Sequence, residues 1–119
     1  MTDAPVLVTG AAGGRQGSTG FNVTRLLLER GQPVRSFVHR LDERSDRLAA
    51  LGADVVVGDL HDLRSVTDAM ASVQRAYFTF PVQEGLLEAT ATFAAAGRAA
   101  GVEQIVNQQR ELFVEAGVR

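Results

Sequence analysis

The sequence predicts an α/β protein with a doubly wound parallel sheet, and three observations support this prediction. Short apolar runs alternate with longer stretches of helical periodicity along the chain. Glycine follows several of the longer stretches, as expected for residues that end helices in a left-handed conformation. A glycine cluster separates the first apolar run from the first helical stretch. Because a short hairpin cannot join parallel neighbours, strands and helices that alternate at this spacing imply a parallel sheet.

Five short segments are expected to form the strands of this sheet. The first is apolar enough to be buried on both faces, and the fourth combines aromatic residues with a following proline. The expected strands are Pro5–Thr9, Val34–His39, Asp54–Gly58, Ala76–Phe80 and Gln104–Asn107. We expect these five strands in the order 3-2-1-4-5.

The intervening stretches are expected to form helices. Gly31 and Pro33 end the first of them, and Gly52 and Gly101 stand where C-terminal caps belong. The expected helices are Gly17–Arg30, Asp42–Leu51, Leu63–Ala71 and Glu84–Ala100, and Glu111–Ala116 can supply a final turn or two.

The composition limits the classes of function. At 119 residues, with 45% hydrophobic and 22% charged residues, the chain is predicted to form a single domain over residues 1–119. A formal net charge of -2 gives no electrostatic case for nucleic acid or membrane binding. The sequence contains no cysteine, which excludes disulfides and cysteine-ligated metals, and no metal site is predicted. It shows neither an apolar run of about 18 residues nor a signal-peptide pattern, so a cytoplasmic location is expected.

A glycine-rich turn joins the first expected strand to the first expected helix. Glycine there lets the backbone take positive φ and approach a ligand closely, so that N–H groups at the start of the helix can bind a diphosphate. This context favours a Rossmann-type dinucleotide-binding turn over a tight turn without a ligand. The candidate pyrophosphate-binding residues are Gly10, Gly13, Gly14 and Gly17, with Gly10, Gly13 and Gly17 as the main set. Gly14, Gly17 and Gly20 form an alternative set with more regular spacing.

Two polar residues, Arg15 and Gln16, lie at the tip of this turn. A guanidinium at this position can reach a phosphate, and an amide can hydrogen-bond ribose or pyrophosphate. For Arg15, a solvated loop arginine without a ligand is an equally good interpretation.

The end of the second expected strand is where nicotinamide cofactors are usually distinguished. An acidic residue there accepts from the ribose 2′-hydroxyl of NAD(H), whereas an arginine accommodates the 2′-phosphate of NADP(H). The strand ends in His39 and Arg40, and no carboxylate appears before Asp42. Arg40 therefore favours NADP(H) over NAD(H), with Asp42 left as the alternative contact to the ribose.

Two further strand ends supply candidate contacts with a dinucleotide. Asp59 and Leu60 follow the third expected strand beside the adenine pocket, where Asp59 can accept from the base and Leu60 can pack on its ring. Capping of the following helix is the alternative role for Asp59. Thr79, Phe80 and Pro81 end the fourth strand near the point where the strand order reverses, which is where the nicotinamide half is expected.

Four stretches, at residues 8–17, 34–40, 52–60 and 100–106, carry a family resemblance. Together they resemble the NmrA-like family of atypical short-chain dehydrogenases, almost continuously over residues 4–107. The resemblance implies that the turn at Gly14–Gly17 lies against pyrophosphate and that Asp59 lies against adenine. It also implies either an NADPH-preferring reductase of quinones or ketones or a regulator that binds the dinucleotide without turnover.

The resemblance also implies a substrate-binding half after the fifth strand, and we expect that half to be missing here. Asn107 is followed almost directly by Glu111–Ala116, which resembles a later family helix, as if an intervening segment were missing. Short-chain reductases typically use a tyrosine four residues before a lysine as a proton donor. The chain has one tyrosine, Tyr77, in an expected strand and no lysine, so no catalytic residue is assigned.

The leading hypothesis is an NADPH-dependent oxidoreductase that acts on a small quinone or carbonyl, because hydride chemistry belongs largely to the cofactor. A non-catalytic NAD(P)-sensing regulator and a truncated cofactor-binding fragment are the alternatives. Association with a second copy or another protein would fit either of them. A doubly wound domain without a cofactor is less favoured, because five glycines in the eleven residues from Gly10 to Gly20 exceed what a bare turn needs. A domain that binds S-adenosylmethionine is also less favoured, since no acidic residue ends the second strand.

Overall fold

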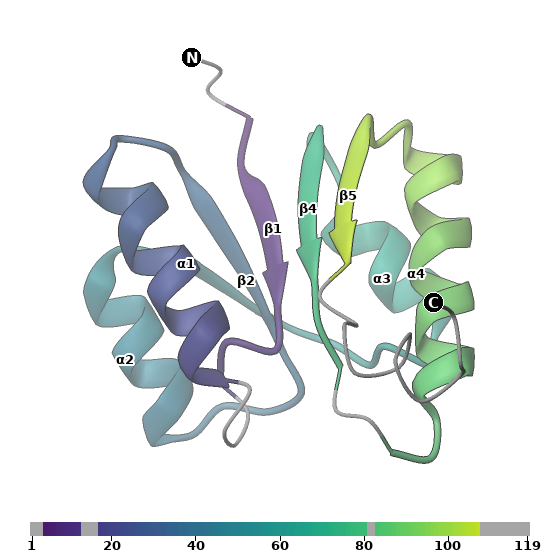
Figure 1. Ribbon diagram of the computed structural model, residues 1–119, viewed down its shortest axis with the longest axis horizontal. Helices are drawn as coiled ribbons and strands as arrows, with labels where there is room; N and C mark the ends of the chain where they lie inside the picture. Colours follow the sequence, from purple (N-terminus) through teal and green to yellow (C-terminus); the bar gives the residue numbers. More distant parts are fainter. Residues whose placement is uncertain (1–3, 13–16, 81–82, 108–119) are drawn as a thin grey trace, which may run out of the picture.

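A computed structural model describes residues 4–12, 17–80 and 83–107 and shows a central sheet with helices on both faces (Figure 1). Its elements in chain order are β1 (Val6–Thr9), α1 (Gly17–Glu29), β2 (Val34–Val38), α2 (Glu43–Leu51), β3 (Asp54–Val57), α3 (Leu63–Ala69), β4 (Arg75–Phe78), α4 (Leu86–Ala100) and β5 (Gln104–Asn107). All four strand pairs are parallel, and the order is β3-β2-β1-β4-β5. The predicted fold class and strand order are therefore confirmed. The predicted turn at Glu111–Ala116 lies outside the described residues.

The strand residues alternate between two apolar layers. Leu7, Phe37 and Phe78 pack with residues of α3 and α4, among them Val66 and Phe93. The neighbouring positions of the same strands face the opposite layer, where Val8, Val34 and Val38 pack with Leu48 of α2 and with residues of α1. Because both faces are covered, β1 can be almost wholly apolar, as the sequence predicted for the first strand. The arrowheads of β1, β4 and β5 point to the same edge of the sheet, downward in Figure 1.

The largest boundary differences lie around β4. The predicted strand Ala76–Phe80 is observed at Arg75–Phe78, because the backbone N–H of Thr79 donates to the Thr9 hydroxyl instead of continuing the ladder. The predicted helix Glu84–Ala100 begins only at Leu86, after Gly85 with a φ of 93°.

The helix predicted at Leu63–Ala71 ends at Ala69. The guanidinium of Arg35 in β2 donates to the carbonyl oxygens of Ala69 and Ala71, at 2.7 and 2.8 Å, and so satisfies groups that the helix leaves unpaired at its end. Elsewhere the expected elements extend one residue too far, at Pro5, Arg30, His39, Asp42 and Gly58. No helix in the described part of the chain is long and apolar enough to cross a membrane.

Candidate functional site

A pocket of about 500 Å³ opens at the carboxyl edge of the sheet. Connections that follow β1, β2, β3 and β4 all contribute to its lining, as the crossing point of a doubly wound sheet requires. Six of the residues singled out from the sequence line it together: Gly10, Arg40, Asp59, Leu60, Thr79 and Phe80. Its volume lies within the roughly 300–1,000 Å³ that is usual for small-molecule sites.

Two residues of the pocket lining, Gly10 and Thr79, belong to the β1–β4 seam, which is formed by Thr9, Gly10 and Thr79. The Thr9 hydroxyl donates to the Thr79 carbonyl oxygen and accepts from the Thr79 N–H, both at 3.0 Å, and both side chains are buried. Gly10 has a φ of +76°, and a Cβ there would overlap the Thr79 Cγ2 methyl. The seam therefore requires glycine for its backbone conformation and for its space.

A second glycine of the turn packs α1 against β1. A Cβ on Gly20 would lie 2.8 Å from Ala11 Cα, too close for any side chain at this position. Gly20 thus serves close packing between helix and strand, which is one of the three roles of glycines in dinucleotide-binding turns. Gly17 is the first residue of α1. Gly13, Gly14, Arg15 and Gln16 lie outside the described residues, so their predicted contacts with pyrophosphate remain predictions.

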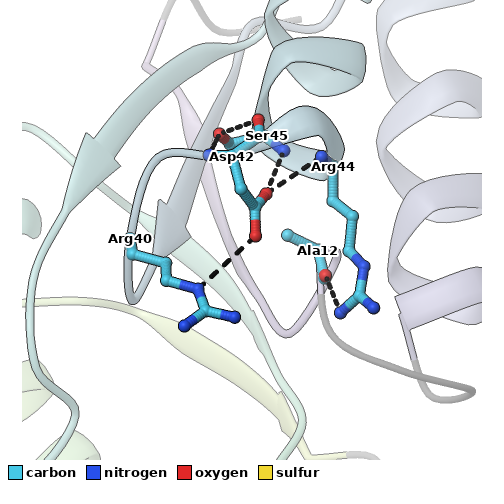
Figure 2. A network of polar contacts seen from close by, with 5 residues as sticks. All are labelled: Ala12, Arg40, Asp42, Arg44 and Ser45. Atoms are coloured by element: carbon cyan, nitrogen blue, oxygen red, sulfur yellow. Dashed lines mark hydrogen bonds and ion pairs between the residues drawn. The ribbon is translucent and has the colours of Figure 1, made fainter.

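Beyond β2, the pocket is bordered by the arginine corner, formed by Arg40, Asp42 and Arg44 (Figure 2). Asp42 is the N-cap of α2: its Oδ1 accepts from the backbone N–H groups of Arg44 and Ser45, and the Ser45 hydroxyl accepts from the Asp42 N–H. This capping box explains why the helix begins here. The hydrogen bond from the Ser45 backbone is the main cause that holds the pKa of the Asp42 carboxyl below its ordinary value.

The two guanidinium groups of the corner approach the pocket from different sides. Arg40 Nε lies 3.6 Å from Asp42 Oδ2, and the Arg40 side chain is 78% exposed. Arg44 Nη1 donates to the Ala12 carbonyl oxygen at 3.4 Å, which ties the start of α2 to the turn after β1 (Figure 2). Asp42 is thus engaged by the helix start and by Arg40, while two cations stand beside the pocket.

Asp59 and Leu60, which follow β3, also line the pocket. Asp62 is the N-cap of α3, so the alternative capping role for Asp59 is not observed. Instead, Asp59 Oδ1 accepts from the backbone N–H of His61 at 2.8 Å, which closes a local turn. Gly58 supports this loop, because a Cβ there would overlap Ser65 and Phe37.

The structure brings into the site three residues that the sequence interpretation did not assign to it. Thr9 is hidden in a strand, and only its pairing with a residue 70 positions away reveals its role. His61 lines the pocket, and so does Arg44, which could have been found from the capping pattern Asp42-x-x-Ser45 because that pattern places Arg44 in the first helical turn. Pro81 lies outside the described residues, so its predicted contact stays a prediction.

This fold matches those of known proteins. The model of the NmrA-like family matches residues 2–110, so the chain belongs to the NmrA-like family, whose members have an NAD(P)-binding fold. Triphenylmethane reductase of Citrobacter sp., solved in complex with NADP(H), is 28% identical with a TM-score of 0.67; the match covers 86% of this chain and 36% of the reductase. ChuY, an anaerobilin reductase from Escherichia coli O157:H7, is 25% identical with a TM-score of 0.69; this match covers 87% and 49% of the two chains.

A curated relative adds a similarity of sequence. Sterol demethylase protein B of Methylococcus capsulatus is 42% identical over 73 residues, which are 61% of this chain and 21% of the relative. The chain therefore spans less than half of the length of each of these three proteins.

Proposed function

We propose that the chain binds NADP(H), with the adenosine 2′-phosphate at the arginine corner. The observation that carries this proposal is the pair of guanidinium groups, Arg40 and Arg44, beside a pocket that Gly10 and Asp59 also line. Guanidinium groups bind phosphate through several N–H donors and stay charged at every physiological pH. The only carboxylate of this corner, Asp42, caps α2 and pairs with Arg40. It is therefore a poor acceptor for the ribose 2′-hydroxyl of NAD(H).

The residues present fit the remaining parts of a dinucleotide. Gly10 allows a ligand to approach the end of β1, where any side chain would meet Thr79. Asp59 offers a carboxylate to the amino group of adenine, and Leu60 and Phe80 offer apolar surface to its ring. The solved complex of triphenylmethane reductase with NADP(H) supports the same class of cofactor.

The test is a pair of fluorescence titrations, with NADPH and with NADH, on the wild type and on Arg40→Ala and Arg44→Ala. Each variant loses a charge-assisted contact with the 2′-phosphate, so its affinity for NADPH is expected to fall by about tenfold or more and its affinity for NADH by less than about threefold. Arg30→Ala, at an exposed arginine just after α1, is the matched control and is expected to change neither affinity. Equal losses for both cofactors would contradict the 2′-phosphate assignment.

We further propose that the protein to which this fold belongs is an oxidoreductase that reduces a small quinone or carbonyl. The reductases among its structural relatives support this reaction class. Reduced nicotinamide supplies the hydride when it is bound, so the task of the chain is to orient the cofactor and to shape one side of the pocket. The sequence contains no lysine, so the Tyr-x-x-x-Lys proton donor of short-chain reductases is not available from this chain.

Steady-state oxidation of NADPH with simple quinones tests the reaction. Turnover that follows NADPH affinity across the arginine variants would support a reductase. Tight NADPH binding without turnover by any quinone or ketone would contradict it and favour the alternative, a regulator that senses the cofactor. A flat response to both cofactors in the binding titration would remove the dinucleotide from both hypotheses.

A further inference from the structure

His61 makes two contacts with one oxygen of Asp59. Its backbone N–H donates to Asp59 Oδ1 at 2.8 Å, and its ring Nδ1 lies 3.6 Å from the same oxygen. Within residues 4–12, 17–80 and 83–107, the other carboxylate oxygen, Oδ2, has no hydrogen-bond or ion-pair partner. The carboxylate is therefore held through one oxygen, and the other oxygen is available to accept from a ligand.

The opposite side of the His61 ring reaches the loop before α4. Nε2 lies 2.9 Å from the Gly85 carbonyl oxygen, and because a carbonyl oxygen only accepts, Nε2 carries the hydrogen. The same oxygen also accepts from the Ala89 N–H at 2.9 Å, in the first turn of α4. The ring stands edge-on against Phe80, with centroids 5.7 Å apart and an interplanar angle of 89°. One side chain thus joins the loops after β3 and β4.

This contact depends on the residue opposite the ring. Gly85 has a φ of +93°, and a Cβ there would lie 2.9 Å from His61 Nε2. A larger residue at position 85 would push the ring away from the carbonyl. The close approach of the two loops therefore uses the smallest residue in one loop and a donor of suitable length in the other.

We infer that His61 is a positioning residue for the adenine half of the cofactor. Its ring clamps the loop after β3 to the start of α4, and in the loop so fixed its backbone N–H holds Asp59 so that Oδ2 accepts from the exocyclic amino group of the base. This inference rests on the proposed function, because it assumes that a dinucleotide occupies the pocket. Its consequence is base selectivity: hypoxanthine carries a carbonyl where adenine carries the amino group, and two acceptors cannot hydrogen-bond each other.

The test compares the dissociation constants of NADPH and of its hypoxanthine analogue, measured by fluorescence titration. The wild type is expected to bind the analogue about tenfold more weakly, as for the loss of a hydrogen bond to a charged group. His61→Leu fills similar space beside Phe80 but donates no hydrogen bond. The ratio of the dissociation constant of the analogue to that of NADPH is therefore expected to fall to about threefold or less in this variant. His61→Gln keeps an amide donor for the Gly85 carbonyl and is expected to keep most of the ratio.

Asp59→Asn serves as the matched control for the acceptor itself. Its amide can donate to the hypoxanthine carbonyl, so the preference for adenine is expected to vanish or reverse while His61 is intact. If His61 had a purely structural role, its substitution would weaken the binding of both nucleotides equally. The inference would be overturned if the ratio of the two dissociation constants were unchanged in His61→Leu, or if His61→Gln lost the ratio as fully as His61→Leu. His61→Ala provides a second variant should the leucine variant fold poorly. Wild-type protein that binds NADPH with no base selectivity overturns only this inference, whereas wild-type protein that does not bind NADPH overturns the proposed function.

Discussion

The β1–β4 seam and the arginine corner border one pocket, but their geometry is fixed in different ways. In the seam, the residues Thr9 and Thr79 are 0% and 3% exposed and the two hydrogen bonds are 3.0 Å long. In the corner, the Arg40 side chain is 78% exposed, and the contacts of the two arginines are 3.6 and 3.4 Å long. Buried polar contacts are costly to leave unmade, whereas exposed ion pairs contribute little to stability. The seam therefore sets the shape of the pocket, and the corner is suited to choosing the ligand.

The largest effect is expected at the centre of the seam. Gly10→Ala places a Cβ against Thr79 at a φ of +76° and is expected to destabilise the fold by about 3–5 kcal/mol through overpacking and backbone strain. Urea unfolding followed by circular dichroism measures this loss. Thr79→Ser removes the overlapping methyl group, so the double variant is expected to recover part of the stability. A Gly10→Ala variant as stable as the wild type would show that the seam can relax, and would contradict its role in setting the shape of the pocket.

The next effect concerns the hydroxyl that links the two strands. Thr9→Val preserves the shape of the side chain but leaves the N–H and the carbonyl oxygen of Thr79 without this partner, and we expect a loss of about 2–3 kcal/mol. The same unfolding measurement applies, with Thr9→Ser as the control that keeps the hydroxyl. If valine and serine were equally tolerated, packing rather than hydrogen bonding would hold the seam.

In the arginine corner, the expected stability effect is smaller and depends on pH. The hydrogen bond from the Ser45 backbone is the main cause that lowers the pKa of Asp42 in the folded chain, so its charge stabilises the fold above the unfolded value of about 3.9. This contribution is lost as the pH falls through the lowered folded value. Asp42→Asn retains a good N-cap without the charge. At pH 7 the wild type is therefore expected to melt at a higher temperature than Asp42→Asn, and this difference should shrink below about pH 4. A difference that stays constant with pH would contradict the charge effect.

The smallest effect is expected at Ser36, a second buried hydroxyl. Ser36 in β2 is fully buried, as Thr9 is, but within the described residues its hydroxyl has no hydrogen-bond partner. Ser36→Ala removes a buried polar group that makes no bond, and we expect a change within about 1 kcal/mol, neutral or stabilising. Thermal unfolding of Ser36→Ala and of Thr9→Val, measured together, compares the contribution of an unpaired buried hydroxyl to stability with that of a paired one. A large loss in Ser36→Ala would reveal a partner for this hydroxyl.

Several features of the site were predictable because they depend on local sequence. The glycine turn after β1, Arg40 after β2 and Asp59 after β3 all follow strand ends, and parallel strands bring their carboxyl ends to one edge. The contacts that those residues make were not predictable. Whether Asp42 turns toward a ribose or caps a helix depends on the hydroxyl of Ser45, and whether Asp59 caps α3 depends on the neighbouring Asp62.

Local sequence patterns were enough to predict the alternation of strands and helices, the order of the sheet and the edge at which the pocket lies, because helix periodicity, apolar runs and glycine caps act over a few residues. The folded structure is needed to bring Thr9 to Thr79, Arg44 to Ala12 and His61 to Gly85. These pairs come from different connections between strands, and their contacts form only once the sheet has brought its strand ends together. No local pattern encodes such a distance across the fold.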